Sequence, residues 1–174
     1  TITAASGNTV QFDFADGGTD ARTYAIAGTD SDDVLNFDIN GVDLGDGGQT
    51  FNGVETLNIA VSGTSVLDGA VTLTASAATQ TINVTGDGTF TLGNTTADRV
   101  DTTGLASGST FNGGTSQSTV QFTGGAADDT FTGSGNADIL SGGAGDDVLT
   151  GGDGTDVVTG GAGDDTFAFD ADDQ

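Results

Sequence analysis

The sequence predicts an all-β protein, a parallel β-solenoid or β-roll built as one continuous right-handed stack. Three observations support this prediction. The last part of the chain repeats a nine-residue pattern of Gly, Asp and one large apolar residue five times. The part before it contains short Thr-, Val- and Phe-rich segments, separated by Gly, Ser, Asn or Asp. Apolar and polar residues alternate in these segments, as in residues 81–85 (TINVT), and no helical period is present.

The nine-residue units have Gly at the first position, Asp at the sixth and a large apolar residue at the eighth. They begin at Gly124, Gly133, Gly142, Gly151 and Gly160. The first six residues should form a turn, because Gly adopts backbone angles closed to other residues. The next three should form a short strand whose central side chain points inward. Two units then make one coil, so that every second turn along the chain lies over the same edge.

This stacking places Asp129 near Asp147 and Asp165 on one edge, and Asp138 near Asp156 on the other. Each pair of stacked turns offers only carboxylate and main-chain carbonyl oxygens. Oxygen ligands without N or S favour Ca²⁺, whereas Mg²⁺ needs a small octahedral site and keeps its waters. Five turns stacked in this way predict at least three Ca²⁺ sites. The alternative is that these Asp and Gly residues only form turns.

The units resemble the RTX nonapeptide repeat, GGxGxDxUx, of secreted calcium-binding proteins. The resemblance implies that the sixth-position Asp residues are calcium ligands. It also implies ligands at turn positions two and four, namely Gly125, Gly143, Gly145, Gly152, Gly154, Gly161, Gly163 and Asn136. Ala127 replaces the fourth Gly of the first unit, and Ser134 and Asn136 replace both Gly residues of the second. Since Asn tolerates the left-handed conformation and Ala does not, the first turn should give a weaker site.

The acids at other positions are expected to behave differently. The fifth-position residues Asp128, Asp146 and Asp164 should point to solvent. Near the N-terminus, residues 28–36 form a degenerate unit, which makes Asp30, Asp32 and Asp33 weaker metal candidates, with plain turns as the default. Acids are sparse in between, where Thr and Asn ladders should hold the coils.

These differences divide the chain into three predicted segments. Residues 1–53 form an acidic β segment, residues 54–122 a Thr-rich β-solenoid and residues 123–169 the RTX β-roll. One short helix is expected around Ala75–Thr79.

The composition excludes several classes of function. The net charge is −24, with 26 acidic and 2 basic residues, and the chain has neither Cys nor His. Nucleic acid and anionic membranes need a basic surface, so neither is expected as a partner. Zinc sites of the usual kind and thiol or imidazole catalysis are excluded as well. The two bases, Arg22 and Arg99, lie in no recognisable catalytic constellation, so no enzymatic activity is expected.

A second resemblance concerns the order of segments. DDVLNF (residues 32–37), VETLNI (54–59), Thr- and Ala-rich strands and a final GGAGDDTFAF (160–169) together resemble the C-terminal part of RTX-type surface-layer proteins of Gram-negative bacteria. This resemblance implies a structural protein, secreted by a type I system, that folds with calcium and self-associates into a layer at the cell surface. Cell-surface polysaccharide, bound through parts outside this chain, is a further implied partner.

Three alternatives remain. The first is a calcium-folding RTX module of a type I-secreted toxin, enzyme or adhesin. The second is an enzyme acting on polysaccharide, which the scarcity of bases disfavours. The third is ice binding by rows of Thr, which the unequal spacing of the Thr-x-Thr segments disfavours.

Overall fold

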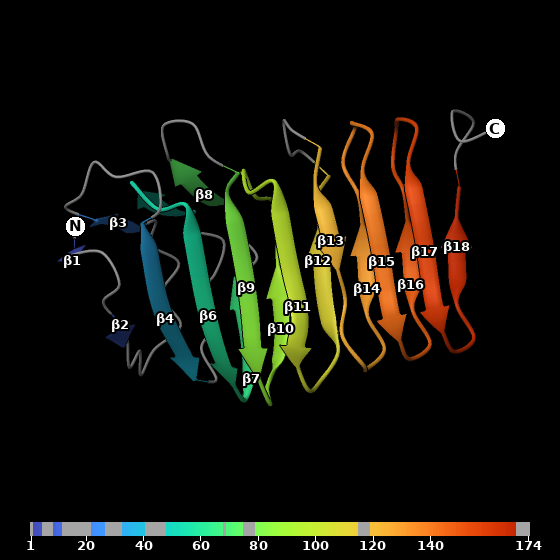
Figure 1. Cartoon of the computed structure of the whole chain (residues 1–174), viewed down its shortest axis with the longest axis horizontal. Helices are drawn as coiled ribbons and strands as arrows, with labels where there is room; N and C mark the ends of the chain where they lie inside the picture. The colour runs from blue at the N-terminus through green and yellow to red at the C-terminus, as the bar shows by residue number, and fades with distance from the viewer. Residues whose placement is uncertain are drawn as a thin grey trace.

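The computed structural model describes residues 2–4, 9–11, 22–26, 33–40, 48–67, 69–74, 79–114 and 119–169. These residues form 18 strands in three sheets, and none of them is helical. Most of the expected helix, residues 75–78, lies outside the described residues. No helix that could span a membrane occurs in the part of the chain that is described. The strands stack along one axis from the N-terminal to the C-terminal end (Figure 1), which confirms the all-β solenoid.

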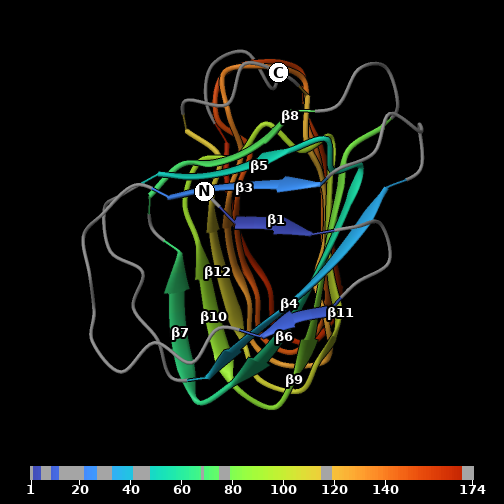
Figure 2. The same cartoon turned by 90° about the vertical axis from the view of Figure 1, so that its left-hand side faces the viewer.

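Two long sheets form the walls of the solenoid and face each other, and a shorter third sheet crosses them at the N-terminal end (Figure 2). The eight-stranded sheet contains β2 (Thr9–Gln11), β4 (Val34–Asn40), β6 (Thr56–Ser62), β9 (Thr81–Gly86), β11 (Arg99–Leu105), β13 (Gln121–Thr123), β15 (Ile139–Ala144) and β17 (Val157–Ala162). The six-stranded sheet contains β7 (Thr64–Leu67), β10 (Thr89–Leu92), β12 (Ser109–Asn112), β14 (Thr130–Thr132), β16 (Val148–Thr150) and β18 (Thr166–Ala168). The four-stranded sheet contains β1 (Ile2–Ala4), β3 (Arg22–Ile26), β5 (Gln49–Asn52) and β8 (Val71–Thr74).

All pairs between these strands are parallel, so each strand lies over the equivalent strand of the previous coil. Equivalent positions in the nonapeptide block are 18 apart, as for Asp138 and Asp156. Toward the N-terminus the separation grows, to 22 between Asn36 and Asn58 and to 25 between Asn58 and Asn83. The larger coils hold the extra strands of the four-stranded sheet. The eight-stranded sheet also continues across the predicted segment boundaries, which remain a prediction.

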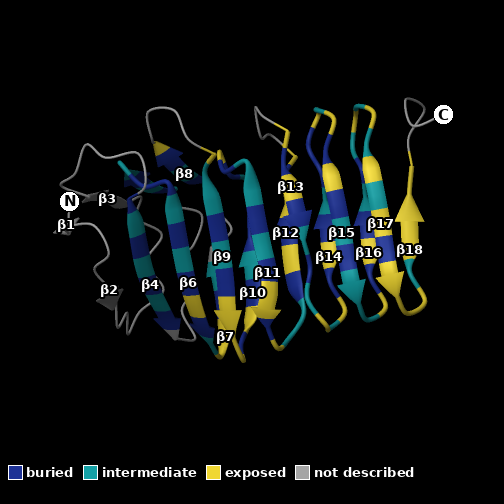
Figure 3. Ribbon diagram, viewed as in Figure 1, coloured by how far each residue is buried: buried dark blue, intermediate teal, exposed yellow. Residues whose placement is uncertain are grey.

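The core is a pair of apolar rows, one on the inner face of each wall. The eight-stranded sheet contributes Leu35, Leu57, Ile82, Val100, Phe122 and Leu140, and the six-stranded sheet contributes Leu92, Phe111, Phe131 and Leu149; each is at most 2% exposed. The eighth-position residues of the nonapeptides therefore point inward, as predicted. In the last coil Val158 is only partly buried and Phe167 is 40% exposed. Figure 3 shows that exposed residues gather on β17 and β18, the last strands of the described stack.

Polar ladders hold the middle coils together on the outside, as the sequence predicts. Asn83 donates a hydrogen bond of 2.9 Å from Nδ2 to Oδ1 of Asn58, which in turn donates one of 2.8 Å to Oδ1 of Asn36. Thr74 Oγ1 donates a 2.7 Å hydrogen bond to Oδ1 of Asn52. These side chains sit at equal heights on adjacent coils, where amide and hydroxyl groups pair without a metal.

The threonines also show where spacing in the sequence is misleading. Thr91, Thr110 and Thr130 lie in register on neighbouring strands, although the intervals between them along the chain are unequal. The difference is absorbed in the turns, so these three residues form a short row. Val148 interrupts the row before Thr166.

Candidate calcium site

The turns of the last three units have one common backbone shape. Their second and fourth Gly residues, at positions 143, 145, 152, 154, 161 and 163, all have φ between 98° and 136°. At Gly143 (φ 117°) a Cβ atom would also collide with the carbonyl oxygen of Gly125 in the coil below. Only Gly suits this position, because the backbone angle and the close approach both exclude a side chain.

The first two units have turns of a different shape. No described residue other than Gly has a positive φ, so Ser134, Asn136 and Ala127 are not left-handed, and neither is Gly125. The sequence leads one to expect a left-handed Asn136, and that expectation is wrong. The second turn is closed instead by Ser134 Oγ, which lies 3.1 Å from the main-chain N and 3.2 Å from the Nδ2 of Asn136.

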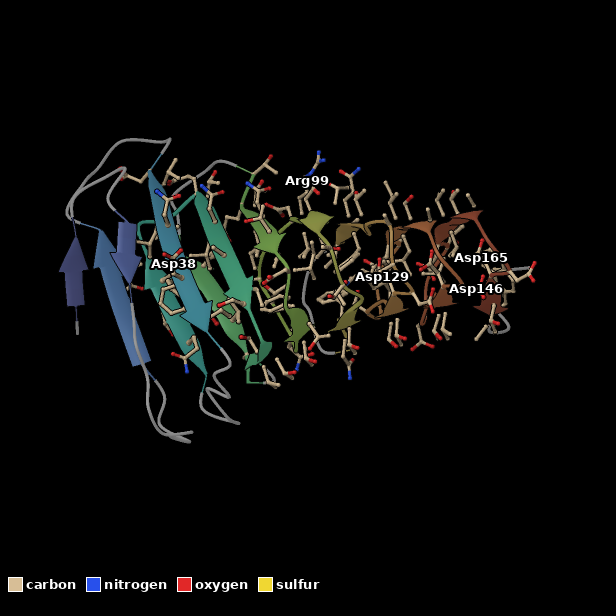
Figure 4. The ribbon with its side chains drawn as sticks, turned by 90° about the horizontal axis from the view of Figure 1, so that it is seen from below. Asp38, Arg99, Asp129, Asp146 and Asp165 are labelled. Carbon is tan, nitrogen blue, oxygen red and sulfur yellow. The ribbon has the colours of Figure 1, made fainter. Side chains whose placement is uncertain are left out.

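The sixth-position carboxylates stack in two columns, as the repeat predicts. Oδ1 of Asp147 accepts a hydrogen bond of 2.8 Å from the N–H of Asp129, and Oδ1 of Asp165 accepts one of 3.1 Å from the N–H of Asp147. On the other edge, Oδ1 of Asp156 accepts one of 2.8 Å from the N–H of Asp138. Each of these carboxylates therefore joins its own coil to the one before. Figure 4 shows Asp129 and Asp165 along the nonapeptide half of the molecule.

Asp147 carries a carboxylate oxygen without a partner. The residue is 1% exposed, and its Oδ2 has no hydrogen-bond partner. Burial raises the pKa of this carboxyl group, and the charges of Asp129, Asp165 and Asp128 raise it further, against the opposing hydrogen bond from Asp129. A buried carboxylate among other carboxylates is costly unless a cation compensates it.

The first two sixth-position residues are satisfied within the protein. Asp129 Oδ1 accepts hydrogen bonds from the N–H and hydroxyl of Ser109, at 2.6 and 2.8 Å, and its Oδ2 accepts one of 3.0 Å from Gly125. Asp138 Oδ1 accepts one from Val120, and its Oδ2 accepts two from the N–H and hydroxyl of Ser134. These carboxylates are therefore stabilised differently from Asp147.

Ser109 and Ser134 are functional residues that the sequence reasoning missed. Ser134 appeared only as a departure from the repeat. Ser109 precedes Asp129 by 20 residues, and that irregular spacing conceals its register with the Asp column. Both are buried, and each donates a hydroxyl hydrogen bond to a sixth-position carboxylate.

The fifth-position acids are exposed, as predicted, but they are also ordered. Oδ1 of Asp128 accepts a hydrogen bond of 2.8 Å from the N–H of Asp146, whose own Oδ1 accepts one of 2.8 Å from the N–H of Asp164. These bonds run in the opposite direction to those of the sixth-position column. On this edge, fifth- and sixth-position carboxylates therefore link each coil to its neighbours in both directions.

The donor set fits Ca²⁺. Asp147 supplies a buried oxygen without a partner, and the turns around it add only main-chain carbonyls and further carboxylates. Among the described residues, no three acidic, His or Cys side chains converge on one point. A calcium ion at these turns would therefore take part of its ligands from the main chain. When bound, it would supply the positive charge that offsets the carboxylate column.

The remaining predicted residues lie elsewhere. Asp30 and Asp32 are outside the described residues, whereas Asp33 is buried in front of β4. Arg99 is on the outer surface of β11 and forms an ion pair of 3.1 Å with Asp101. Although burial opposes it, hydrogen bonds from Thr103 and Arg99 lower the pKa of Asp101.

Comparison with known proteins supports the assignment of calcium to the repeated turns. Residues 121–149 and 132–167 match the family model of the RTX calcium-binding nonapeptide repeat (4 copies). No curated protein and no solved structure matches the chain significantly. The match covers the block that contains the left-handed Gly turns and both Asp columns. The chain thus contains RTX calcium-binding repeats, which are typical of calcium-binding modules in secreted proteins.

Proposed function

We propose that this RTX-repeat chain is part of a secreted structural protein that folds with calcium and assembles into a bacterial surface layer at the cell surface. At a net charge of −24, the metal-free chain repels itself and has a thin core to offset its conformational entropy. Because the stacked turns exist only in the folded roll, the free energy of calcium binding becomes free energy of folding. A chain kept unfolded at low cytosolic calcium can pass a type I secretion channel and fold outside.

The observation that carries the layer hypothesis is the surface of the last coils. The described large apolar side chains that remain exposed all fall in the nonapeptide half, namely Ile139, Val148, Val157, Phe167 and Phe169, with exposures of 40 to 64%. The exposed column of Asp128, Asp146 and Asp164 lies in the same half. Apolar contact together with calcium bridging between acidic columns would join neighbouring molecules. We assign no catalytic role to the chain.

The second candidate is a calcium-folding RTX module of a type I-secreted toxin, enzyme or adhesin. The family match favours it equally, because the match covers the repeats and nothing outside them. In this case calcium would fold the chain without joining copies of it.

Light scattering after gel filtration separates the two functions. The chain is measured in chelator and then in about 5 mM Ca²⁺, near the range of weak extracellular sites. Conversion of an expanded monomer into large, regular particles, visible by electron microscopy, supports the layer. Compaction to a stable monomer contradicts the layer and supports the module.

A matched pair of variants tests the calcium step itself. Asp147→Ala together with Asp156→Ala should raise the calcium midpoint of folding, followed by far-UV circular dichroism, at least several-fold. Asp87→Ala removes an exposed acid outside the block and should leave the midpoint nearly unchanged. An equal midpoint in the double variant and the wild type would contradict calcium binding at these turns.

A further inference from the structure

Asp33 is a buried acid far from the RTX block. It directly precedes β4 and is 1% exposed, and neither Oδ1 nor Oδ2 has a hydrogen-bond partner. Its main chain is well bonded, since its carbonyl oxygen accepts hydrogen bonds of 3.1 Å from the N–H groups of Glu55 and Thr56. The coil contacts therefore hold the residue in place while its charged group has no partner.

A second acid lies against it. Glu55 is 5% exposed, and its Oε2 accepts a hydrogen bond of 2.9 Å from the N–H of Asp33. The Glu55 carboxylate thus contacts the very residue that carries the unpartnered carboxylate. A bound cation would stabilise the buried, unpartnered carboxylate of Asp33 and take the Glu55 carboxylate as a second oxygen ligand. The basic side chain that the structure describes, that of Arg99, pairs with Asp101 instead.

Two other acids at the same height of the coil, Asp98 and Asp138, accept hydrogen bonds through their carboxylates. The residues that precede β4, β6, β11 and β15 lie in one column, because these strands stack in register. In this column Asp98 Oδ2 accepts a hydrogen bond of 2.8 Å from the N–H of Gln80. Both oxygens of Asp138 accept hydrogen bonds. Asp33 therefore differs from Asp98 and Asp138, because both of its carboxylate oxygens lack a partner, and turn formation alone does not account for its carboxylate.

We propose that Asp33 and Glu55 bind a divalent cation, best matched by Ca²⁺, at the N-terminal end of the solenoid. Their two carboxylates supply hard oxygen ligands and the negative charge that a Ca²⁺ ion neutralises. The site lies outside the RTX match, which begins at residue 121, and it does not depend on the surface-layer function. It would clamp β4 to β6, in the part of the stack that has the larger coils.

Counting bound calcium by native mass spectrometry on the full chain tests the proposal. Asp33→Asn and Glu55→Gln should each bind one Ca²⁺ fewer than the wild type, whereas Asp87→Asn should bind the same number. Asp147→Asn should lose calcium independently, so that the Asp33→Asn and Asp147→Asn losses add in the double variant. Equal calcium counts in Asp33→Asn, Glu55→Gln and the wild type would overturn the proposal.

If Asp33→Asn folds poorly, hydrogen exchange in a chain that keeps Asp33 and Glu55 tests the site instead. In a chain carrying Asp147→Asn and Asp156→Asn, added calcium should still slow exchange of the main-chain amides in residues 33–40 and 55–62. Mg²⁺ at the same concentration should protect these amides less. No change in their protection on adding calcium would reject the site, whatever the RTX block does.

Discussion

The N–H of Asp129 donates a hydrogen bond of 2.8 Å to Oδ1 of Asp147, one coil further along the chain. The sixth-position carboxylate thus has two tasks. One oxygen ties its coil to the coil before, and the other, in Asp147, is left buried and without a partner. The fold therefore assembles the column, and a bound cation would offset its negative charge.

Ser109 should stabilise the junction between the Thr-rich coils and the RTX block without binding metal. Ser109→Ala removes a buried hydroxyl that donates to Asp129, and it should lower the free energy of unfolding by about 1–2 kcal/mol. The number of bound calcium ions should not change. Thermal unfolding at saturating calcium measures the loss. Ser107→Ala, which removes an exposed hydroxyl bonded to Asp87, is the control and should cost less. A loss of calcium in Ser109→Ala would contradict this role.

Gly143 should be irreplaceable in its turn. Gly143→Ala forces a side chain onto a φ of 117° and against the carbonyl oxygen of Gly125, at a cost of at least about 1–2 kcal/mol. Since the distorted turn carries the calcium ligands, the calcium midpoint should rise too. Gly135→Ala is the matched control, because a Cβ atom there meets nothing within 4 Å. Calcium titrations followed by circular dichroism compare the two, and equal midpoints would refute the turn geometry.

Phe122 should be the most sensitive core position near the junction. Its ring centroid lies 4.8 Å from that of Phe111 and 3.6 Å from that of Phe131. Phe122→Ala should therefore lower the free energy of unfolding by about 3–5 kcal/mol through lost burial and a cavity. Phe169→Ala, where the ring is 64% exposed, should cost little. Denaturant unfolding in calcium gives both values, and comparable losses would argue against the junction core.

The metal-free protein should become less stable as pH rises. Asp147 has a folded-state pKa above its ordinary value of 3.8, so the folded chain holds this proton more tightly than the unfolded chain. Its contribution favours the fold at low pH and is lost as pH rises from 3.8 through the raised pKa. In chelator, the fraction of folded chain, followed by far-UV circular dichroism, should fall over this range, less steeply in Asp147→Asn than in Asp87→Asn.

Calcium should reverse this trend, because protons compete with the metal for the carboxylate. With calcium present, the thermal midpoint of the wild type should rise with pH over the same range. A slope in chelator that is identical for Asp147→Asn and Asp87→Asn would show that general charge repulsion alone causes the effect.

The periodicity of the nonapeptides was enough to predict much of this structure. The regular repeat places Asp129, Asp147 and Asp165 in one column, and the eighth-position apolar residues inside, because a regular coil has only one register that buries them. The oxygen-only ligands of the repeated turns likewise predicted calcium. Alternation of side chains in residues 81–85 was sufficient to identify β9.

Only the tertiary structure decided which residues meet where neighbouring coils differ in length. The turns vary in length, so no fixed spacing reveals that Ser109 lies beside Asp129, that Thr91 aligns with Thr110, or that Glu55 lies against Asp33. Sequence also could not show which carboxylate oxygens find a main-chain N–H. Asp129 and Asp147 have the same position in their units, yet of these two only Asp147 has an oxygen that lacks a partner. The physical reason is that hydrogen bonds to a carboxylate depend on the shape of the neighbouring turn, which the folded backbone alone determines.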